Sequence, residues 1–219
     1  MALFHPDSGN LILHVVYDGI PRSGKTESVR SLGRLFDRPV RTFEERDGRT
    51  LFFDWLDYAG GTCLDRPIQC RVLSVPGQIE LSRRRTRIVS AADVVVFVFD
   101  SSPEGVEASQ RRFRTLQRQL KSRHRPIPVL VQANKQDLTG AEPPRSVQER
   151  LGVEPTPLAT VATEDRGIRE VFVLAVGAAV RSLREADLVF PHKHRDGTAE
   201  SSLPGPDELL GILLDVDSH

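Results

Sequence analysis

Residues 11–26 read LILHVVYDGIPRSGKT, an apolar run followed directly by a glycine-rich loop. A continuous apolar, β-branched run is typical of a strand buried on both faces of a parallel sheet. The loop from Gly19 to Thr26 fits the pattern G-x-x-x-x-G-K-[ST], and a helix pattern begins at Lys25. In such a loop the glycines let backbone N–H groups converge on phosphate oxygens, and the lysine adds positive charge. The sequence therefore predicts a nucleoside-triphosphate site on an α/β sheet.

Strand and helix patterns alternate along the rest of the chain. Further apolar runs lie at 68–75, 94–100, 128–134 and, more weakly, 157–162, and helix-like stretches lie at 25–36, 81–90, 104–123 and 167–184. This alternation predicts βαβ units and hence a doubly wound, mostly parallel α/β sheet. The run RTLFFDWL at 49–56 is separated from Ile68 by a loop short enough for a hairpin, so we expect it to be one antiparallel edge strand.

Composition and length limit the class of protein. The 219 residues suit one domain with a tail, and 39% hydrophobic with 27% charged residues is ordinary for a globular protein. The formal net charge is zero, which argues against broad electrostatic binding to nucleic acid or to an anionic membrane. The chain has two cysteines, no apolar run long enough to span a bilayer, no signal-peptide pattern and no lipidation motif. We therefore expect a cytoplasmic protein without a direct membrane anchor.

The segment NKQD at 134–137 indicates which base the nucleotide carries, because it follows the apolar run 128–134 at a strand end. An Asp137 carboxylate can accept hydrogen bonds from guanine N1–H and N2–H, and adenine does not present this pair of donors. Asn134 and Lys135 would hold the loop and cover the face of the base. The motif therefore predicts a guanine nucleotide and argues against an ATP-using P-loop enzyme.

The segment SVPGQ at 74–78 ends another apolar run. Its Gly77 can offer a backbone N–H to a γ-phosphate, and Gln78 can orient an attacking water. A plain Pro-Gly turn is the alternative, and the position of the segment between the other two motifs argues against it. The hydroxyl of Thr26 can ligate Mg²⁺ beside the phosphates.

These motifs, in this order, resemble those of Ras-like small GTPases and, more closely, those of the bacterial MglA type. The likeness covers about residues 11–185 and includes GRTLFFDWL, SVPGQ, VVVFVFDSS, NKQDL and VATEDRG. It implies the P-loop small GTPase fold, with a GTPase domain over residues 1–185. After about residue 185 the sequence becomes rich in proline, glycine and charged residues, which predicts a flexible tail over residues 186–219. The apolar segment DELLGILLDV at 207–216 either folds back onto the domain or serves as a docking peptide.

The resemblance also implies roles for individual residues. Thr50 would be the switch threonine that reaches Mg²⁺ and the γ-phosphate, and Arg49 would act in cis on the transition state. Ala162 and Thr163 would lie near the guanine carbonyl oxygen. The nucleotide-binding residues expected are Gly19, Arg22, Ser23, Gly24, Lys25, Thr26, Glu27, Thr50, Gly77, Asn134, Lys135, Asp137, Ala162 and Thr163. The catalytic residues expected are Gln78 and Arg49, and the metal ligands expected are Thr26 and Thr50.

Two positions depart from the family pattern. Ser74 stands where Ras relatives have an aspartate that contacts magnesium through water, so we expect weaker metal retention with GDP bound. Pro21 has no N–H and a fixed φ, and crowding there can displace Gln78 or Arg49. Because neighbouring side chains of an extended segment point in opposite directions, Arg49 and Thr50 can both reach the phosphates only if the strand bulges or slides.

Two functions remain open at this stage. The first is a GTP-hydrolysing molecular switch that uses Mg²⁺, with slow intrinsic turnover. The resemblance then implies a role in bacterial polarity, motility or related signalling, with a roadblock-domain (MglB-type) regulator and downstream effectors as partners. The second is a nucleotide-loaded scaffold with negligible hydrolysis, a pseudo-GTPase that recruits a partner. Gln78 and Arg49 favour the switch, whereas Pro21 and Ser74 keep the scaffold open.

Overall fold

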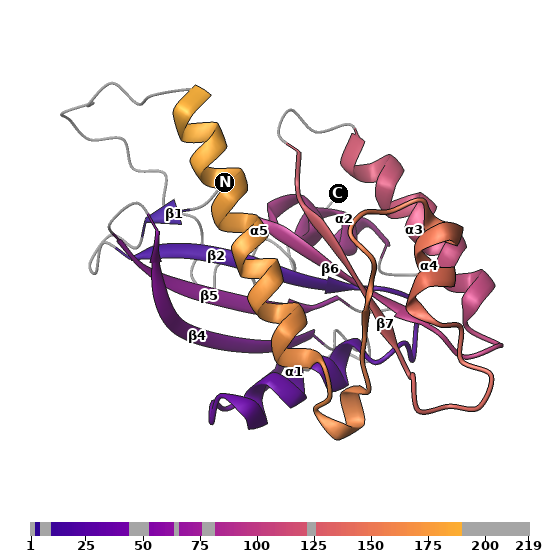
Figure 1. Cartoon of the computed structure of the whole chain (residues 1–219). Coiled ribbons are helices and arrows are strands. Elements are labelled where there is room, and N and C mark those ends of the chain that lie inside the picture. The colour runs from indigo at the N-terminus through magenta and orange to yellow at the C-terminus, as the bar shows by residue number, and fades with distance from the viewer. Residues whose placement is uncertain are drawn as a thin grey trace, which may run out of the picture.

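The computed structural model describes residues 3–4, 10–43, 53–63, 66–75, 82–121 and 126–189. Figure 1 shows a twisted sheet with helices on both of its faces. The strands are β1 (Leu3–Phe4), β2 (Leu11–Asp18), β3 (Arg41–Phe43), β4 (Phe53–Cys63), β5 (Arg66–Ser74), β6 (Val94–Asp100), β7 (Val129–Asn134) and β8 (Leu158–Ala159). The helices are α1 (Lys25–Leu35), α2 (Ser82–Ala91), α3 (Val106–Lys121), α4 (Pro144–Leu151), the short 3₁₀ helix η2 (Ala162–Glu164) and α5 (Ile168–Val189).

The strand order in the sheet is β3-β4-β5-β2-β6-β7-β8, with β1 paired to β2. The strands from β5 to β8 in this order pair in parallel, whereas β4 is antiparallel to β5 and β1 is antiparallel to β2. The predicted doubly wound, mostly parallel α/β fold is therefore confirmed. The segment expected as an antiparallel strand forms β4, and the two-residue β1 is a second antiparallel strand. The three-residue β3 adds a short antiparallel pairing on the outer side of β4.

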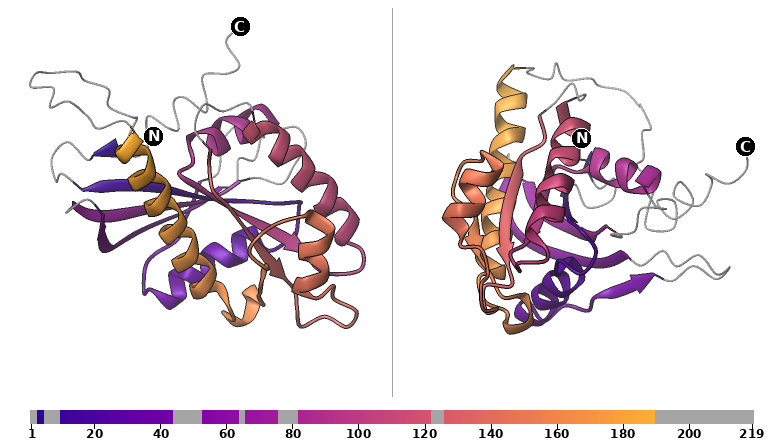
Figure 2. Two further views of the ribbon diagram at one scale, coloured as in Figure 1. Left: turned by 45° about the horizontal axis from the view of Figure 1, so that its top comes forward. Right: turned by 90° about the vertical axis from the view of Figure 1, so that its right-hand side faces the viewer.

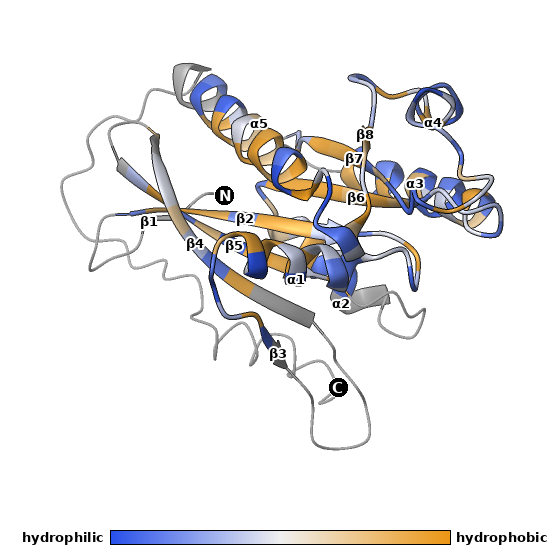
Figure 3. Ribbon diagram, turned by 60° about the horizontal axis from the view of Figure 1, so that its bottom comes forward, coloured by the Kyte–Doolittle hydropathy of each residue, from blue (hydrophilic) through white to orange (hydrophobic). Residues whose placement is uncertain are grey.

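The core consists of two apolar clusters, one on each face of the sheet. Leu13, Val15 and Tyr17 of β2 pack under α1 and α5, and Val16 packs on the opposite side under α2 and α3. This division follows from the strand geometry, since successive side chains point to opposite faces. Every residue of β2 and β6 is buried, which explains why both were continuous apolar runs in the sequence. The two further views in Figure 2 show the helices covering both faces, and Figure 3 shows how apolar the central strands are.

Besides the short strands β1 and β3, for which no strand was predicted, three elements differ from their sequence predictions. The strand β4 continues to Cys63, through residues that we expected to form a hairpin loop, and its register shifts between Ala59 and Thr62. Such a bulge accommodates Gly61, whose φ of 80° lies in the left-handed region. The helix α5 continues to Val189, four residues beyond the expected boundary at 185. The tail from residue 190 lies outside the described residues, so the proposed domain division stays a prediction.

The helix α4 is the third difference, because its residues gave no helix pattern. It buries only Val147 and Leu151, so the apolar spacing is too sparse to reveal a helical period. Pro144 lies in its first turn, where the missing N–H costs no hydrogen bond. Gly152 ends the helix with a φ of 62°.

Candidate functional site

Three of the sequence motifs meet at one edge of the sheet. The loop from Gly19 to Thr26 follows β2, the NKQD segment follows β7, and η2 follows β8. These parallel strands all end at the same edge of the sheet. Ligands of doubly wound sheets bind in the crevice beyond the carboxyl ends of the strands. The fold therefore brings together residues that are more than 100 positions apart in the chain.

The backbone of the Gly19–Thr26 loop requires its two glycines. Gly19 has a φ of 155°, and a Cβ there would lie 2.5 Å from the carbonyl oxygen of Val98. Gly24 has a φ of 104° and caps the N-terminus of α1, and a Cβ there would collide with the side-chain nitrogen of Asn134. Both positions therefore exclude a side chain. The result is a tight loop that delivers the N-terminus of α1 to the edge of the sheet, where its N–H groups favour an anion.

Lys25 is the buried cation of this loop. Its side chain is largely buried, and Nζ donates a hydrogen bond of 2.6 Å to the carbonyl oxygen of Ile20. Burial lowers the pKa of Lys25 to about 8, the Asp18 carboxylate opposes this shift, and Arg85 and Arg112 reinforce it. Nearby, Ser23 Oγ is buried and has no hydrogen-bond partner within the described part of the chain. A buried ammonium and an unpartnered hydroxyl in a glycine loop suit a phosphate group, which supplies negative charge and acceptor oxygens.

Asn134 joins the three segments of the site. Its Nδ2 donates to the carbonyl oxygen of Ser23 at 2.8 Å. Its Oδ1 accepts from Thr160 Oγ1 at 3.0 Å and from the backbone N–H of Ala162 at 3.1 Å. The residue is buried, so these contacts are made away from water. Asn134 thus fixes the geometry of the NKQD segment against the phosphate loop and η2.

The other residues predicted to contact the base lie around Asn134. Lys135 has a left-handed φ of 67°, and its Nζ donates to Asp100 Oδ2 at 2.7 Å. Asp137 is exposed, and its carboxylate makes no hydrogen bond or ion pair with any other described residue. Thr163 is exposed, and the N–H of Ala162 is engaged by Asn134 as described above. An uncommitted carboxylate beside a fixed loop can accept hydrogen bonds from a ligand such as guanine.

The remaining predicted residues of the phosphate loop differ in their surroundings. Arg22 is exposed with a φ of 61°, and Thr26 is half-buried. Glu27 accepts a hydrogen bond of 3.0 Å from Arg34 Nη2. The same nitrogen of Arg34 lies 2.6 Å from Asp165 Oδ1, directly after η2, and this contact lowers the pKa of the Asp165 carboxyl. Glu27 therefore belongs to an ion-pair network between α1 and the segment after η2.

Four predicted residues, namely Arg49, Thr50, Gly77 and Gln78, lie outside the described residues. Their predicted roles in hydrolysis and metal binding stay predictions. Ser74 is described, and it is buried at the end of β5 opposite Tyr17 of β2.

Sequence reasoning missed a charged cluster behind the phosphate loop. Asp18 is the last residue of β2 and is fully buried. It pairs with Arg112 of α3 and lies 3.8 Å from Arg85 Nε of α2. The signal was present in the sequence, since Asp18 is the single acidic residue of a largely apolar strand and lies at its end. Its two partners could not be inferred, because they are far away along the chain.

Comparison of the sequence with known proteins identifies the family of the chain. The model of the ADP-ribosylation factor (Arf) family matches residues 57–179, which is more than half of the chain. The chain belongs to the Arf family of small GTPases. Among curated proteins, this Arf-family chain is 29% identical over 153 residues to the mutual gliding-motility protein MglA of Myxococcus xanthus (strain DK1622). That match covers 64% of the chain and 76% of the relative.

Family membership confirms the predicted small-GTPase fold and the expected class of a GTP-binding GTPase. The MglA match agrees with the resemblance seen in the sequence motifs. Within the described residues of this Arf-family protein, no helix is long and apolar enough to cross a membrane.

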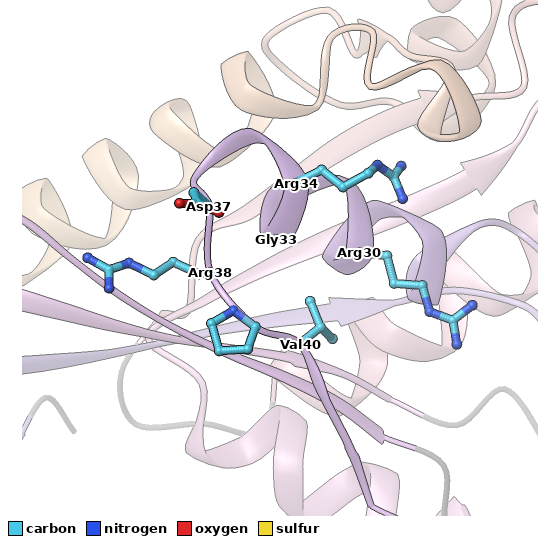
Figure 4. Close-up of a pocket in the computed structure, with 7 residues that line it drawn as sticks. Arg30, Gly33, Arg34, Asp37, Arg38 and Val40 are labelled. Atoms are coloured by element: carbon cyan, nitrogen blue, oxygen red, sulfur yellow. The ribbon is translucent and has the colours of Figure 1, made fainter.

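A separate pocket of about 540 Å³ lies at the other end of α1 from the phosphate loop. Its lining residues are Arg30, Gly33, Arg34, Asp37, Arg38, Pro39 and Val40. Figure 4 shows that the side chains of Arg30 and Arg34 point to one side and that of Arg38 points to the other. Because these guanidinium groups do not converge, they do not form an anion-binding site in this pocket of the Arf-family protein.

Proposed function

We propose that this Arf-family protein binds GTP and GDP with Mg²⁺, hydrolyses GTP slowly, and acts as a nucleotide-dependent switch in the cytoplasm. The observation that carries the proposal is the meeting of the phosphate loop, the uncommitted Asp137 carboxylate and η2 around Asn134. This arrangement supplies a phosphate subsite and a base subsite whose separation is set by one buried side chain. The family match supports the same conclusion independently.

The phosphate subsite would work through exchange of hydrogen bonds. Lys25 Nζ donates a hydrogen bond to the Ile20 carbonyl oxygen, and it would donate instead to the β- and γ-phosphates of a bound nucleotide. The unpartnered Ser23 hydroxyl and the N–H groups that begin α1 would add further donors. At the other end of the ligand, Asp137 would accept the guanine N1–H and N2–H. A base without these donors leaves the carboxylate unpaired, and this gives selectivity.

Of the two predicted Mg²⁺ ligands, Thr26 lies within the described residues and Thr50 does not. Within the described residues, no group of three or more His, Cys, Asp or Glu side chains could hold a metal ion. A metal here would therefore use the Thr26 hydroxyl and phosphate oxygens, with Thr50 as the second protein ligand. When bound, the ion neutralises charge on the β- and γ-phosphate oxygens. Gln78 would orient the attacking water, Gly77 would offer its N–H to the γ-phosphate, and Arg49 would stabilise the transition-state charge.

The biological role is proposed from the relative. The curated relative is named for gliding motility, and we assign this chain a role in bacterial motility, polarity or related signalling on that similarity. A roadblock-domain regulator and downstream effectors are the partners that this role implies. A regulator that grips the segment 49–56 could accelerate turnover without adding an arginine of its own.

The test has two stages. First, the nucleotide released from the purified protein by denaturation is identified by chromatography, and GDP or GTP is expected. Second, single-turnover hydrolysis of bound GTP with Mg²⁺ is compared for wild type, Arg49→Ala, Gln78→Ala and the control Gln110→Ala. The Gln110 side chain donates a hydrogen bond to the backbone carbonyl oxygen of Arg150 in α4. Slower hydrolysis in the first two variants supports the switch. If wild type hydrolyses GTP no faster than Gln78→Ala, with and without roadblock-domain proteins, the switch is rejected in favour of the nucleotide-loaded scaffold.

A further inference from the structure

The buried carboxylate of Asp18 lies directly behind the phosphate loop. Its Oδ1 accepts a hydrogen bond of 2.8 Å from the backbone N–H of Gly19, the first glycine of that loop. Its Oδ2 accepts a hydrogen bond from Arg112 Nη2 of α3. Arg85 Nε of α2 lies 3.8 Å from Oδ1. One side chain therefore contacts the phosphate loop and two helices at once.

All three charged groups are shielded from water. The side chain of Asp18 is 0% exposed, and those of Arg85 and Arg112 are 8% and 10% exposed. Buried ion pairs cost desolvation, and breaking one by removal of a partner is strongly destabilising. A cluster of this kind therefore holds its elements in one relative position and resists small displacements. A surface salt bridge would not do this, because water replaces its contacts readily.

The cluster lies close to the lysine of the phosphate loop. Among the described residues, the Asp18 carboxylate faces the guanidinium groups of Arg85 and Arg112, and the Lys25 ammonium is close enough for all three to affect its pKa. In addition, Arg112 Nε is buried without a hydrogen-bond partner within the described residues. The cluster is therefore electrostatically coupled to the lysine that is predicted to contact the phosphates.

The position of α2 in the chain gives this cluster a consequence for hydrolysis. The helix begins at Ser82, four residues after Gln78, which is predicted to orient the attacking water. Arg85 lies in the first turn of α2 and is the residue that points to Asp18. The orientation of the helix therefore constrains where the preceding segment can place Gln78. A displacement of about 1 Å at a positioning group can cost about a hundredfold in rate.

We propose that Asp18, Arg85 and Arg112 form a positioning triad that holds α2 and α3 against the phosphate loop and thereby sets the rate of GTP hydrolysis. This inference rests on the proposed role of Gln78. None of the three residues touches the reacting atoms. They act through the segment between β5 and α2, which carries Gln78, and nucleotide affinity depends on them less than hydrolysis does.

Arg85 is the most informative residue to replace. In Arg85→Gln, Asp18 keeps Arg112 and the Gly19 N–H, so the fold is expected to survive. The matched control is Arg87→Gln, which removes an exposed arginine from the same helix. We expect single-turnover hydrolysis to slow about tenfold or more in Arg85→Gln, with GTP and GDP dissociation constants within about threefold of wild type. Arg85→Lys keeps the charge and is expected to recover part of the rate.

A second measurement tests the triad even if the protein hydrolyses no GTP. Amide hydrogen exchange is followed in α2 with GDP and with a non-hydrolysable GTP analogue bound. Faster exchange in α2 of Arg85→Gln, well below its unfolding temperature and with α5 unchanged, supports the triad. Unchanged exchange in α2 would overturn it, whatever the hydrolysis rate. An equal loss of hydrolysis and of affinity in Arg85→Gln would also overturn it, because that pattern indicates a general structural defect.

Discussion

Nucleotide affinity should depend on pH through Lys25. In the nucleotide-free protein, burial lowers the pKa of this lysine to about 8. Bound phosphates favour the ammonium, so in the complex we expect a pKa near the ordinary value of about 10.4. Below pH 8 both forms hold the proton and the lysine adds no pH dependence. Above pH 8 the free protein has lost the proton and must take it up on binding, so affinity falls as pH rises.

The size of the effect follows from these two pKa values. Between pH 7 and pH 9 the protonated fraction of free Lys25 falls from about nine-tenths to about one-tenth, so the dissociation constant for GDP should rise about tenfold. At pH 8.5 binding should take up roughly three-quarters of a proton. Titration calorimetry in buffers of different ionisation enthalpy measures both quantities on nucleotide-free protein.

The control is Lys25→Arg, since a guanidinium keeps its charge throughout this range. Guanine N1–H also loses its proton in alkaline solution. The Lys25→Arg variant is still subject to this change in the base, but it has no lysine to deprotonate. Equal pH profiles for wild type and Lys25→Arg would refute the argument. If Lys25→Arg binds too weakly to measure, the ¹³Cε chemical shift of Lys25 in nucleotide-free wild type reports its pKa directly, and a midpoint above about 10 would contradict the prediction.

Three further predictions concern the base subsite, the loop backbone and the tail. Asp137→Asn should shift preference from guanine to xanthine nucleotides, measured by competition binding, and equal ATP and GTP affinities in wild type would contradict the assignment. Gly24→Ala should abolish nucleotide binding because its Cβ collides with Asn134, whereas the control Gly152→Ala, with no atom within 4 Å, should cost about 1 kcal/mol of stability and leave affinity unchanged. Removal of residues 190–219 should leave the GTP dissociation constant unchanged by calorimetry, and loss of folding would place that segment in the core.

The parts of the fold that could be predicted are those whose signal is local. Continuous apolar runs reveal β2 and β6 because both faces of these strands are covered, and the phosphate loop is read from residue types at fixed spacing. The helix α4 and the second half of β4 lack such a signal. The first buries only two side chains, and the second contains a pair of glycines that indicate a turn although they form a bulge.

The candidate site shows the same division between residue types and their partners. The sequence indicates that Asn134 belongs to the base subsite, since NKQD follows a strand. It does not reveal that this side chain holds Ser23 across 111 positions of the chain and Thr160 across 26. Those contacts depend on where β7 lies in the sheet, which is a property of the whole topology. Spacing along the chain cannot supply it.

At Asp18, the preference of a buried strand for apolar residues conflicts with the charged contacts that the whole fold makes there. A carboxylate at the end of an eight-residue buried strand is costly unless cations accompany it, and an apolar residue there would satisfy the core directly. Natural sequences break such local rules chiefly at functional sites. Here the cost is offset by Arg85 and Arg112, and the same contacts connect α2 and α3 to the first glycine of the phosphate loop. A charged residue in an apolar strand just before a phosphate loop is therefore a reason to look for long-range arginines on the helices beneath it.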